Sequence, residues 1–593
     1  MLKAEPKGII MNNEEQILSD KKAEHFFFRA SAADFKKIPG SPIAYWLNKK
    51  IIDNFSNRSL GNLISVRGGM TTADNERFVR LWFEVSLRDS AIDNPDSSLK
   101  WFPYNKGGEY RKWFGNRLWI VNWQDNGDAI KQTGRASVRS EELYFSEMIG
   151  WTDVTSYSQL GVRYYGSGFL FDASGPAVFP NKQYDYTLVL GFLGSKVTSI
   201  ILQSLNATLH VQAGNISDLP WLDLSTDAQC ELKRNVFFFV KQARQDWDSF
   251  ETSWDFNNLP LLYSDYRQHI LKGTYQKLRS HWQDITQEMQ RLEEENNRIF
   301  IDAYGLQDEL TPEVPLNEIT LTCNPHYRYS NSKNKEELEV LLLADTMKEF
   351  VSYAVGCMFG RYSLYKPGLI LANQGETIED YWKNIRAYQK LPTDSLFYPD
   401  ADNVIPILDG DWFTDDISER FRKFLCITFG DEHYEENLKF IEVALGKDIR
   451  KYFRKDFYND HVRRYKKRPI YWLFSSPKGS FNALIYMHRY RSDTVSVVLN
   501  YLREFRIKLT TEKNHLEAVS ISASASPGEK TKALKEIESI RKMIEELDSY
   551  EREILYPLAT EQLEIDLDDG VKVNYQKFGP ALKKIPGLDA KEE

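Results

Sequence analysis

The chain has 593 residues, a formal net charge of −9, 42% apolar residues and 13% aromatic residues. This composition supports packed cores and, at this length, roughly three to five domains, so a disordered or fibrous chain is excluded. No stretch approaches the ~18 apolar residues of a membrane-spanning helix, and the first residues carry no apolar signal core. The sequence therefore predicts a globular, cytoplasmic protein.

In chain order, the sequence predicts an α+β multidomain protein that begins with an N-terminal extension over residues 1–24. A β-rich domain follows over residues 25–225, where short apolar runs alternate with Gly-Gly and Asn-Gly turn signals. One helix is expected to begin at Pro42 and to carry Ile43, Tyr45, Trp46 and Leu47. The expected strands include Leu81–Val85, Leu118–Val121, Phe169–Phe171 and Tyr186–Leu190.

Residues 226–305 are predicted to form a helical spacer, because apolar side chains recur there at alternating steps of three and four. This spacing is typical of the seam of a coiled coil or a helix pair, and Gly305 is a plausible end of the helix. Asn296 falls on the next position of the seam. The apolar positions of the seam are Tyr275, Leu278, Trp282, Ile285, Met289 and Leu292.

The remaining sequence divides into three predicted parts. Residues 306–490 form a mixed α/β domain with a basic run, residues 491–560 an antiparallel helical hairpin, and residues 561–593 a C-terminal tail. The hairpin is predicted from two heptad runs, one from Val495 to Leu509 and one from Ala533 to Leu547, separated by a loop from Ser522 to Gly528. Heptads of this kind form spacers or partner-binding faces far more often than active sites.

Residues 100–139 interleave cations, aromatic rings and glycines, with eight Lys or Arg residues against three acids. Because cations pair with phosphates and rings stack on bases, this block predicts a nucleic-acid-binding surface. A solvated loop over buried tryptophans is the alternative interpretation. The cations are Lys100, Lys106, Arg111, Lys112, Arg117, Lys131, Arg135 and Arg139.

A second basic run, from Arg463 to Arg468, places five cations in six positions. Such a run could hold a DNA backbone without reading its sequence, although a solvated charge run is the ordinary alternative. The acidic total does not exclude DNA binding, since association follows the local charge of the contact face. The cations are Arg463, Arg464, Lys466, Lys467 and Arg468.

Motifs of catalysis are absent or incomplete. No phosphate-binding GxxxxGK[ST] loop, nucleophile elbow or His-Glu-x-x-His helix occurs, and the four cysteines lie too far apart for a zinc site, so they are interpreted as reduced thiols, mostly buried. Asn324-Pro325-His326-Tyr327 approaches a motif with which amino-methyltransferases hold a flipped base, but a turn is the better interpretation. Acidic residues that could hold Mg²⁺ in a nuclease are Asp400, Asp402, Asp409, Asp411, Asp415 and Asp416.

Several long strings resemble the C-terminal half of the PglX family, the adenine-specific DNA methyltransferases of BREX phage-defence systems. They include residues 35–42, 100–112, 292–300, 355–364, 405–412, 467–479 and 567–575. The resemblance implies an S-adenosylmethionine domain that precedes a target-recognition part. No cofactor loop and no intact Asn-Pro-Pro-Tyr is present here, so we expect no catalytic residue, metal or cofactor site in this chain and S-adenosylmethionine on a methyltransferase domain in cis or in trans.

We therefore expect a DNA target-recognition part of an adenine-N6 methyltransferase that is non-catalytic alone. Arg and Lys suit guanine edges and Asn suits adenine, although each candidate could equally contact phosphate. The expected partner is double-stranded DNA, and a basic cleft would also accept an acidic DNA-mimicking inhibitor. An assembly scaffold for other BREX proteins and a Mg²⁺ nuclease are the alternative functions. The candidate DNA-binding residues are Arg67, Asn75, Arg77, Lys106, Arg111, Lys112, Arg163 and the five cations of the basic run.

Overall fold

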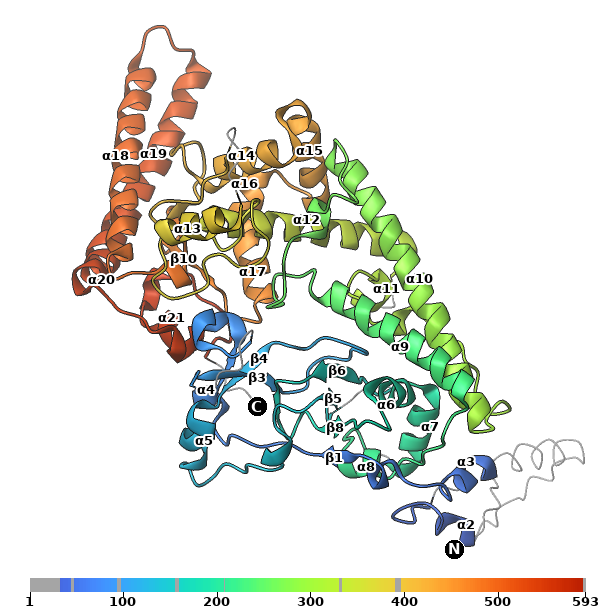
Figure 1. The fold of residues 1–593 in the computed structure, drawn as a ribbon. Coiled ribbons are helices and arrows are strands. Elements are labelled where there is room, and N and C mark those ends of the chain that lie inside the picture. Colours follow the sequence, from blue (N-terminus) through green and yellow to red (C-terminus); the bar gives the residue numbers. More distant parts are fainter. Residues whose placement is uncertain are drawn as a thin grey trace, which may run out of the picture.

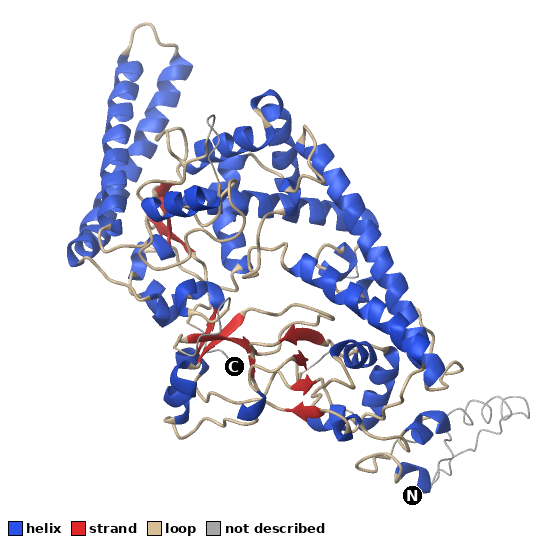
Figure 2. Cartoon of the chain, viewed as in Figure 1, coloured by secondary structure: helices blue, strands red, loops and turns tan. Residues whose placement is uncertain are grey.

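Figure 1 shows a computed structural model, which describes residues 32–43, 47–92, 98–154, 159–206, 208–329, 333–389 and 396–589. The predicted N-terminal extension, together with Tyr45 and Trp46 of the predicted first helix, lies outside the described residues. The structure is α+β, as predicted: helices surround two four-stranded sheets and one three-stranded sheet in the described part of the chain (Figure 2).

Both four-stranded sheets are built from residues 65–179. Their strand orders are β1-β8-β5-β6 and β2-β4-β3-β7, and the pair β3–β7 is parallel while the other pairs are antiparallel. The strands are β1 Ser65–Arg67, β2 Val79–Leu81, β3 Trp101–Asn105, β4 Trp119–Asn122, β5 Met148–Gly150, β6 Arg163–Gly166, β7 Leu170–Phe171 and β8 Ala177–Phe179. The helices around them are α2 Ala32–Phe35, α3 Lys49–Asn54, α4 Asn75–Phe78, α5 Gln124–Lys131, α6 Tyr186–Leu193, α7 Lys196–Leu205 and α8 Ala213–Ser217.

Three predictions in this part are wrong. Of the expected strand Leu81–Val85 only Leu81 lies in a strand, because Trp82–Glu84 form a 3-10 turn. The run Tyr186–Leu190 forms helix α6 and not a strand, because the Asp185 side chain caps the helix by accepting hydrogen bonds from the backbone N–H groups of Thr187 and Leu188. The following side chains are buried on every face, so their sequence carries no helical period. Pro42, Ile43 and Leu47 lie outside any helix, and helix α3 begins only at Lys49, after Asn48 as N-cap.

Two long helices join the sheets to the rest of the molecule (Figure 1). They are α9 Thr226–Trp247 and α10 Leu271–Ala303, which pack against each other, and α10 also contacts α7 at one end and α15 at the other. Of the predicted seam positions, Tyr275, Leu278, Met289 and Leu292 are buried along α10, and Gly305 follows its end in a left-handed conformation with φ +68°.

The central part is mainly helical, around a small sheet in the order β10-β11-β9. Its strands β10 and β11 form an antiparallel hairpin in which Tyr471 lies opposite Tyr486. The helices are α11 Pro325–Arg328, α12 Lys335–Phe359, α13 Ile378–Tyr388, α14 Ile417–Phe429, α15 Tyr434–Leu445, α16 Ile449–Tyr452 and α17 Tyr458–Arg464, with a π-helical turn Phe453–Phe457 before α17. The strands are β9 Ile405–Pro406, β10 Tyr471–Ser475 and β11 Asn482–Tyr486.

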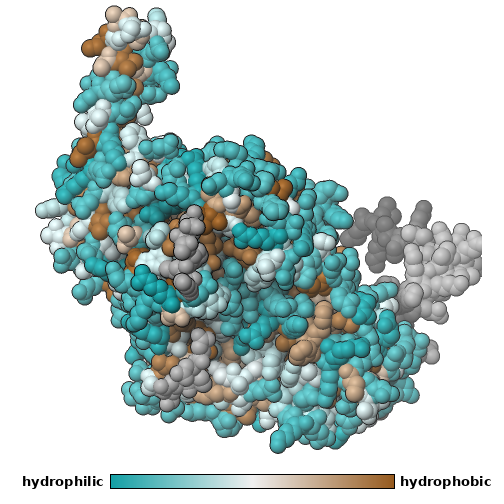
Figure 3. All heavy atoms as spheres, turned by 45° about the horizontal axis from the view of Figure 1, so that its top comes forward, coloured by the Kyte–Doolittle hydropathy of each residue, from teal (hydrophilic) through white to brown (hydrophobic). Residues whose placement is uncertain are grey.

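The predicted C-terminal hairpin is confirmed as α18 Thr494–Ile521 and α19 Pro527–Tyr550, which stand out from the body (Figures 1 and 3). After α20 Tyr556–Glu561 and α21 Gly570–Gln576, the predicted tail packs back onto the central sheet. Phe578 contacts the rings of Trp472 and Phe474 edge-on, so this segment belongs to the core.

Helices α6 and α7 contain many apolar residues. Together, with a bend of 65° between them, they meet the length and apolarity expected of a broken membrane span. Among the described residues, no single helix is long and apolar enough to cross a membrane.

Candidate nucleic-acid interface

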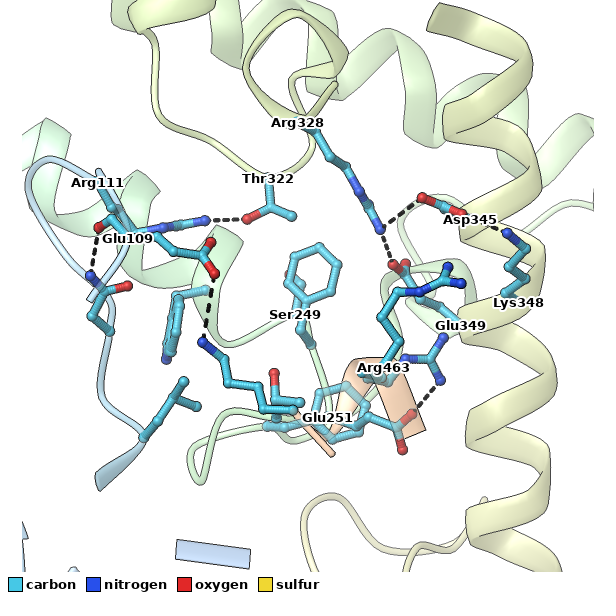
Figure 4. A pocket seen from close by; sticks show the side chains of 18 of the residues that line it. Glu109, Arg111, Ser249, Glu251, Thr322, Arg328, Asp345, Lys348, Glu349 and Arg463 are labelled. Carbon is cyan, nitrogen blue, oxygen red and sulfur yellow. Dashed lines mark hydrogen bonds and ion pairs between the residues drawn. The ribbon is translucent and has the colours of Figure 1, made fainter. Parts of the chain in front are cut away.

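A cavity of about 640 Å³ lies where the β-rich part, the helical spacer and the central part meet. The loop between β3 and β4 reaches it with Glu109 and Arg111, and α12 contributes Asp345, Lys348 and Glu349. The end of α17 and the residues after it add Arg463, Arg464 and Lys466 (Figure 4). The two basic blocks that the sequence predicts therefore meet here, although they are separated by more than 300 residues.

The cations of this cavity are matched by acids. Arg328 contacts Glu349 at 2.7 Å and Asp345 at 3.5 Å, and Lys348 contacts Asp345 at 3.0 Å. Arg464 lies 2.8 Å from Glu251, a buried carboxylate that raises the pKa of Arg464 against the lowering effect of burial. The interior of the cavity is thus a network of ion pairs, one of which, between Arg464 and Glu251, joins the central part to the segment that follows α9.

Arg463 and Lys466 present charge at the rim of the cavity. The Arg463 side chain is 79% exposed and lies 3.5 Å from Asp460 within its own helix. The Lys466 side chain is 47% exposed and lies 3.7 Å from Glu109, which belongs to the β3–β4 loop. Exposed ion pairs of this kind contribute little stability, so both cations can exchange their acidic partner for a phosphate at small cost.

Three candidate DNA-binding residues are buried and have structural partners. Lys112 donates to Glu293 of α10, and Arg111 lies 3.1 Å from Asp246 of α9. Arg163 is fully buried and donates to the carbonyl oxygens of Arg111 and Gly161 at 3.2 and 3.0 Å. These three cations are thus buried and paired within the protein in this conformation, and their role in reading bases stays a prediction.

The basic run divides between surface and interior. Lys467 is exposed and lies against the C-terminal segment, where a methyl group on Gly587 would come within 2.9 Å of its Nζ atom. Arg468 is only 7% exposed and lies 3.9 Å from Glu84, a buried acid whose pKa is raised by burial despite the nearby arginine. Arg464 and Arg468 therefore act inside the protein, whereas Lys467 joins the exposed cations.

The remaining candidates lie away from the cavity. Arg67 is exposed at the end of β1, and it borders a separate hollow beside Glu147. Asn75 and Arg77 lie on α4, where Asn75 accepts a hydrogen bond from Thr72 and Arg77 is exposed. Lys106 is mostly covered and lies 3.8 Å from Asp172. The structure thus does not bring these four residues onto the surface that Arg463 and Lys466 share.

The acids considered for a nuclease are largely paired with arginines. Arg450 contacts both Asp411, at 2.5 Å, and Asp416, and Arg454 lies 2.8 Å from Asp409. Asp402 is different: burial of its carboxyl group, together with the neighbouring Asp400, raises its pKa to about 7. Among the described residues, no group of three or more His, Cys, Asp or Glu side chains could hold a metal ion.

Asn324 of the Asn-Pro-His-Tyr string caps a one-turn helix. Its Oδ1 accepts from the backbone N–H of His326 at 3.1 Å, and its Nδ2 donates to the carbonyl oxygens of Leu316 and Ile319 at 2.7 and 2.9 Å. The side chain is completely buried. Its amide is therefore engaged by the backbone, as the turn interpretation expects, and is not available to hold a flipped base.

Sequence reasoning missed several residues of the cavity, including Arg328, Lys348 and Glu251. Each lies singly among apolar or mixed residues in the sequence, so no local charge cluster marks it. Glu251 follows α9 and pairs with a cation more than 200 residues away. A signal for such residues exists only in the three-dimensional arrangement.

The chain is similar in sequence to two bacterial methyltransferases. It is 36% identical over 587 residues to the adenine-specific methyltransferase PglX of Lacticaseibacillus casei (strain Zhang), covering 93% of this chain and 45% of that protein. It is 34% identical over 578 residues to the adenine-specific methyltransferase BrxX of Escherichia coli O9:H4 (strain HS), covering 94% of this chain and 46% of that protein. The chain is a homologue of these two methyltransferases. No protein-family model matches it.

The chain spans about half the length of PglX and BrxX. Its similarity to both covers 93% and 94% of its residues. The β-rich part, the spacer and the helical hairpin therefore each lie at least partly within the homologous region. The resemblance noted in the sequence is thus supported at the level of homology to adenine-specific methyltransferases.

Proposed function

We propose that this chain is the double-stranded-DNA recognition part of a BREX-type adenine-N6 methyltransferase that marks self DNA in phage defence. The observation that carries the proposal is its homology, over nearly all of its length, to about half of each adenine-specific methyltransferase. The β-rich part would meet the base edges and the α9–α10 spacer would set its distance from catalysis. An acidic protein that mimics DNA would compete for the same cations.

The contact surface that we propose is centred on the exposed part of the basic run. Arg463 and Lys466 lie at the rim of the cavity and Lys467 lies beside the C-terminal segment, so three exposed cations lie close together in the chain at the end of α17. Lys466 and Lys467 have φ values of +49° and +62°, a left-handed turn that ends the helix. Cations in this position would contact phosphates and position the duplex.

Methyl transfer would depend on S-adenosylmethionine bound to a domain outside these 593 residues. Two sequence features weighed for such a site have structural roles: Asn324 is engaged by backbone groups, and Gly166 and Gly168 have left-handed conformations at the turn after β6. We therefore assign this chain recognition, and no step of the transfer reaction.

A charge-reversal experiment tests the proposal. Arg463→Glu, Lys466→Glu and Lys467→Glu together should weaken binding of a 30-base-pair duplex at least about tenfold, because phosphate contacts become repulsive. Arg464 is kept, since its loss would leave Glu251 buried without a partner. The matched control reverses Lys532, Lys535 and Lys542, which are exposed on α19. Equal affinities for the variant and the control would refute the proposed surface.

An assembly role for the α18–α19 hairpin is the second candidate. Apolar side chains are exposed along it: Ile507 at 66%, Ile521 at 83% and Leu534 at 58% (Figure 3). Replacing these three residues by Ser should leave duplex binding unchanged and abolish capture of other BREX proteins if the hairpin is a partner-binding face. Retained capture would refute this role.

A further inference from the structure

A second cavity, of about 1160 Å³, lies on the central part, and six of its 20 lining residues are Lys or Arg. The β10–β11 hairpin turn contributes Lys478, and the π-helical turn before α17 contributes Arg454 and Lys455. The C-terminal segment that packs back onto β10 contributes Lys583 and Lys584. We call this cavity the lysine groove; Lys572 of α21 also lines it.

Acids balance only part of this charge. Lys572 lies 2.6 Å from Glu76, and Arg454 lies 2.8 Å from Asp409. Asp589 also lines the groove, where Gln576 donates to it. Among the described residues, no carboxylate forms an ion pair with the other four cations of the groove, which are Lys455, Lys478, Lys583 and Lys584.

The positive charge of Lys583, which lies inside the groove, is not offset by any nearby acid in the described part of the chain. Its side chain is half-buried, and burial together with the neighbouring Lys455 lowers its pKa. No acid offsets either effect. An anion bound between Lys583 and Lys455 would offset the repulsion between their ammonium groups.

The lysine groove adjoins the surface proposed above. The same stretch of chain that carries Arg454 and Lys455 continues through α17 to Arg463 and Lys466. Lys467 then lies against Gly587, next to Ile585 and Leu588 of the groove wall. Cations thus follow one another from the rim of the central cavity to the groove.

We propose that the lysine groove is a second phosphate-binding site, which holds the backbone of a nucleic acid that also contacts Arg463 and Lys466. Lysines are flexible point charges that suit phosphate without reading sequence. The aromatic ring of the groove, Tyr575, packs edge-on against Trp472, so it offers no stacking platform for a base. This inference rests on the proposed function, because it assigns a second phosphate-binding site for the same duplex.

The test compares three proteins of full length with a 30-base-pair duplex over a range of salt concentrations. The groove variant carries Lys455→Gln, Lys478→Gln and Lys584→Gln, all at exposed positions, and the control carries Lys532→Gln, Lys535→Gln and Lys542→Gln on α19. The groove variant should bind about tenfold more weakly, and its slope of log affinity against log salt should fall by about two to three, roughly one for each phosphate that the variant no longer neutralises. The control should match the wild type.

The possible outcomes separate the two proposals. If the wild type binds the duplex and the groove variant keeps its affinity and salt slope, the groove inference is overturned while the proposed function stands. If the wild type fails to bind the duplex, the proposed function fails, and the groove inference fails with it. A groove variant that loses binding to poly-glutamate but keeps binding to the duplex would show that the groove holds an acidic protein, which also overturns the inference.

Discussion

Lys112 of the β3–β4 loop donates to Glu293 of helix α10, and each side chain is only 2% exposed. The indole Nε1 of Trp113 donates to the other oxygen of the same carboxylate at 2.7 Å. Burial raises the pKa of Glu293, and Lys112 opposes that shift. The sequence pattern assigns Lys112 to DNA binding. In the structure, Lys112 connects the β-rich part to the helical spacer.

Removing this cation should destabilise the protein. Lys112→Met is expected to lower the free energy of unfolding by about 3–5 kcal/mol, because Glu293 would be left buried without a counter-charge. Lys112→Met with Glu293→Gln should recover more than half of that loss, since Gln still accepts from Trp113. Urea unfolding followed by tryptophan fluorescence measures both. An unchanged unfolding midpoint in the single variant, with weaker duplex binding, would instead support the original assignment to DNA.

Asn324→Ala distinguishes a structural role from a base-holding role. The variant loses one accepted and two donated hydrogen bonds to the backbone, so we expect a loss of about 1–3 kcal/mol in stability. Asn324→Asp keeps the cap but not the donors, and it should also be destabilised because its carboxylate would face two carbonyl oxygens. Stability equal to that of the wild type in both variants would argue against the cap assigned here.

Two buried histidines predict a loss of stability in mild acid. Burial, with Arg361 nearby, lowers the pKa of His488 to about 3, and burial lowers the pKa of His461 well below its usual range. Both are neutral in the folded protein, so unfolding takes up protons once the pH falls below the unfolded value of ~6.5. Each histidine then removes up to about 1.4 kcal/mol of stability per pH unit.

His488→Gln should reduce this pH dependence. The His488 ring lies 3.1 Å from the carbonyl oxygen of Val85, and a Gln amide can donate to the same oxygen without titrating. Unfolding midpoints measured at pH 7.5 and pH 5.5 should therefore differ less in the variant than in the wild type. Identical differences would mean that His488 is not held neutral by the fold.

The sequence predicts the long helices well. The seam from Tyr275 to Leu292 alternates in steps of three and four, because α10 buries one stripe only, and the heptads of α18 and α19 behave in the same way. Helix α6 could not be recognised, since all of Thr187–Leu193 is buried and periodicity disappears when every face is covered. A short apolar run is then equally compatible with a strand.

The candidate site was less predictable than the fold. Composition locates the two basic blocks, but it does not reveal which cations meet a carboxylate from a distant part of the chain. Arg111 and Lys112 pair with Asp246 and Glu293, more than 130 residues away, whereas the acid that lies near Arg463 in the described part of the chain is Asp460 of the same helix. The lysine groove forms because the C-terminal segment packs against β10. No local sequence pattern predicts this long-range contact.

The most direct test of the account is the affinity of the wild-type chain for duplex DNA measured by filter binding between 50 and 300 mM salt. If the exposed cations Arg463, Lys466 and Lys467 hold phosphates, log affinity should fall against log salt with a slope of about −3 or steeper, roughly −0.9 for each phosphate contact. An affinity that is independent of salt, or no binding at 50 mM, would contradict it.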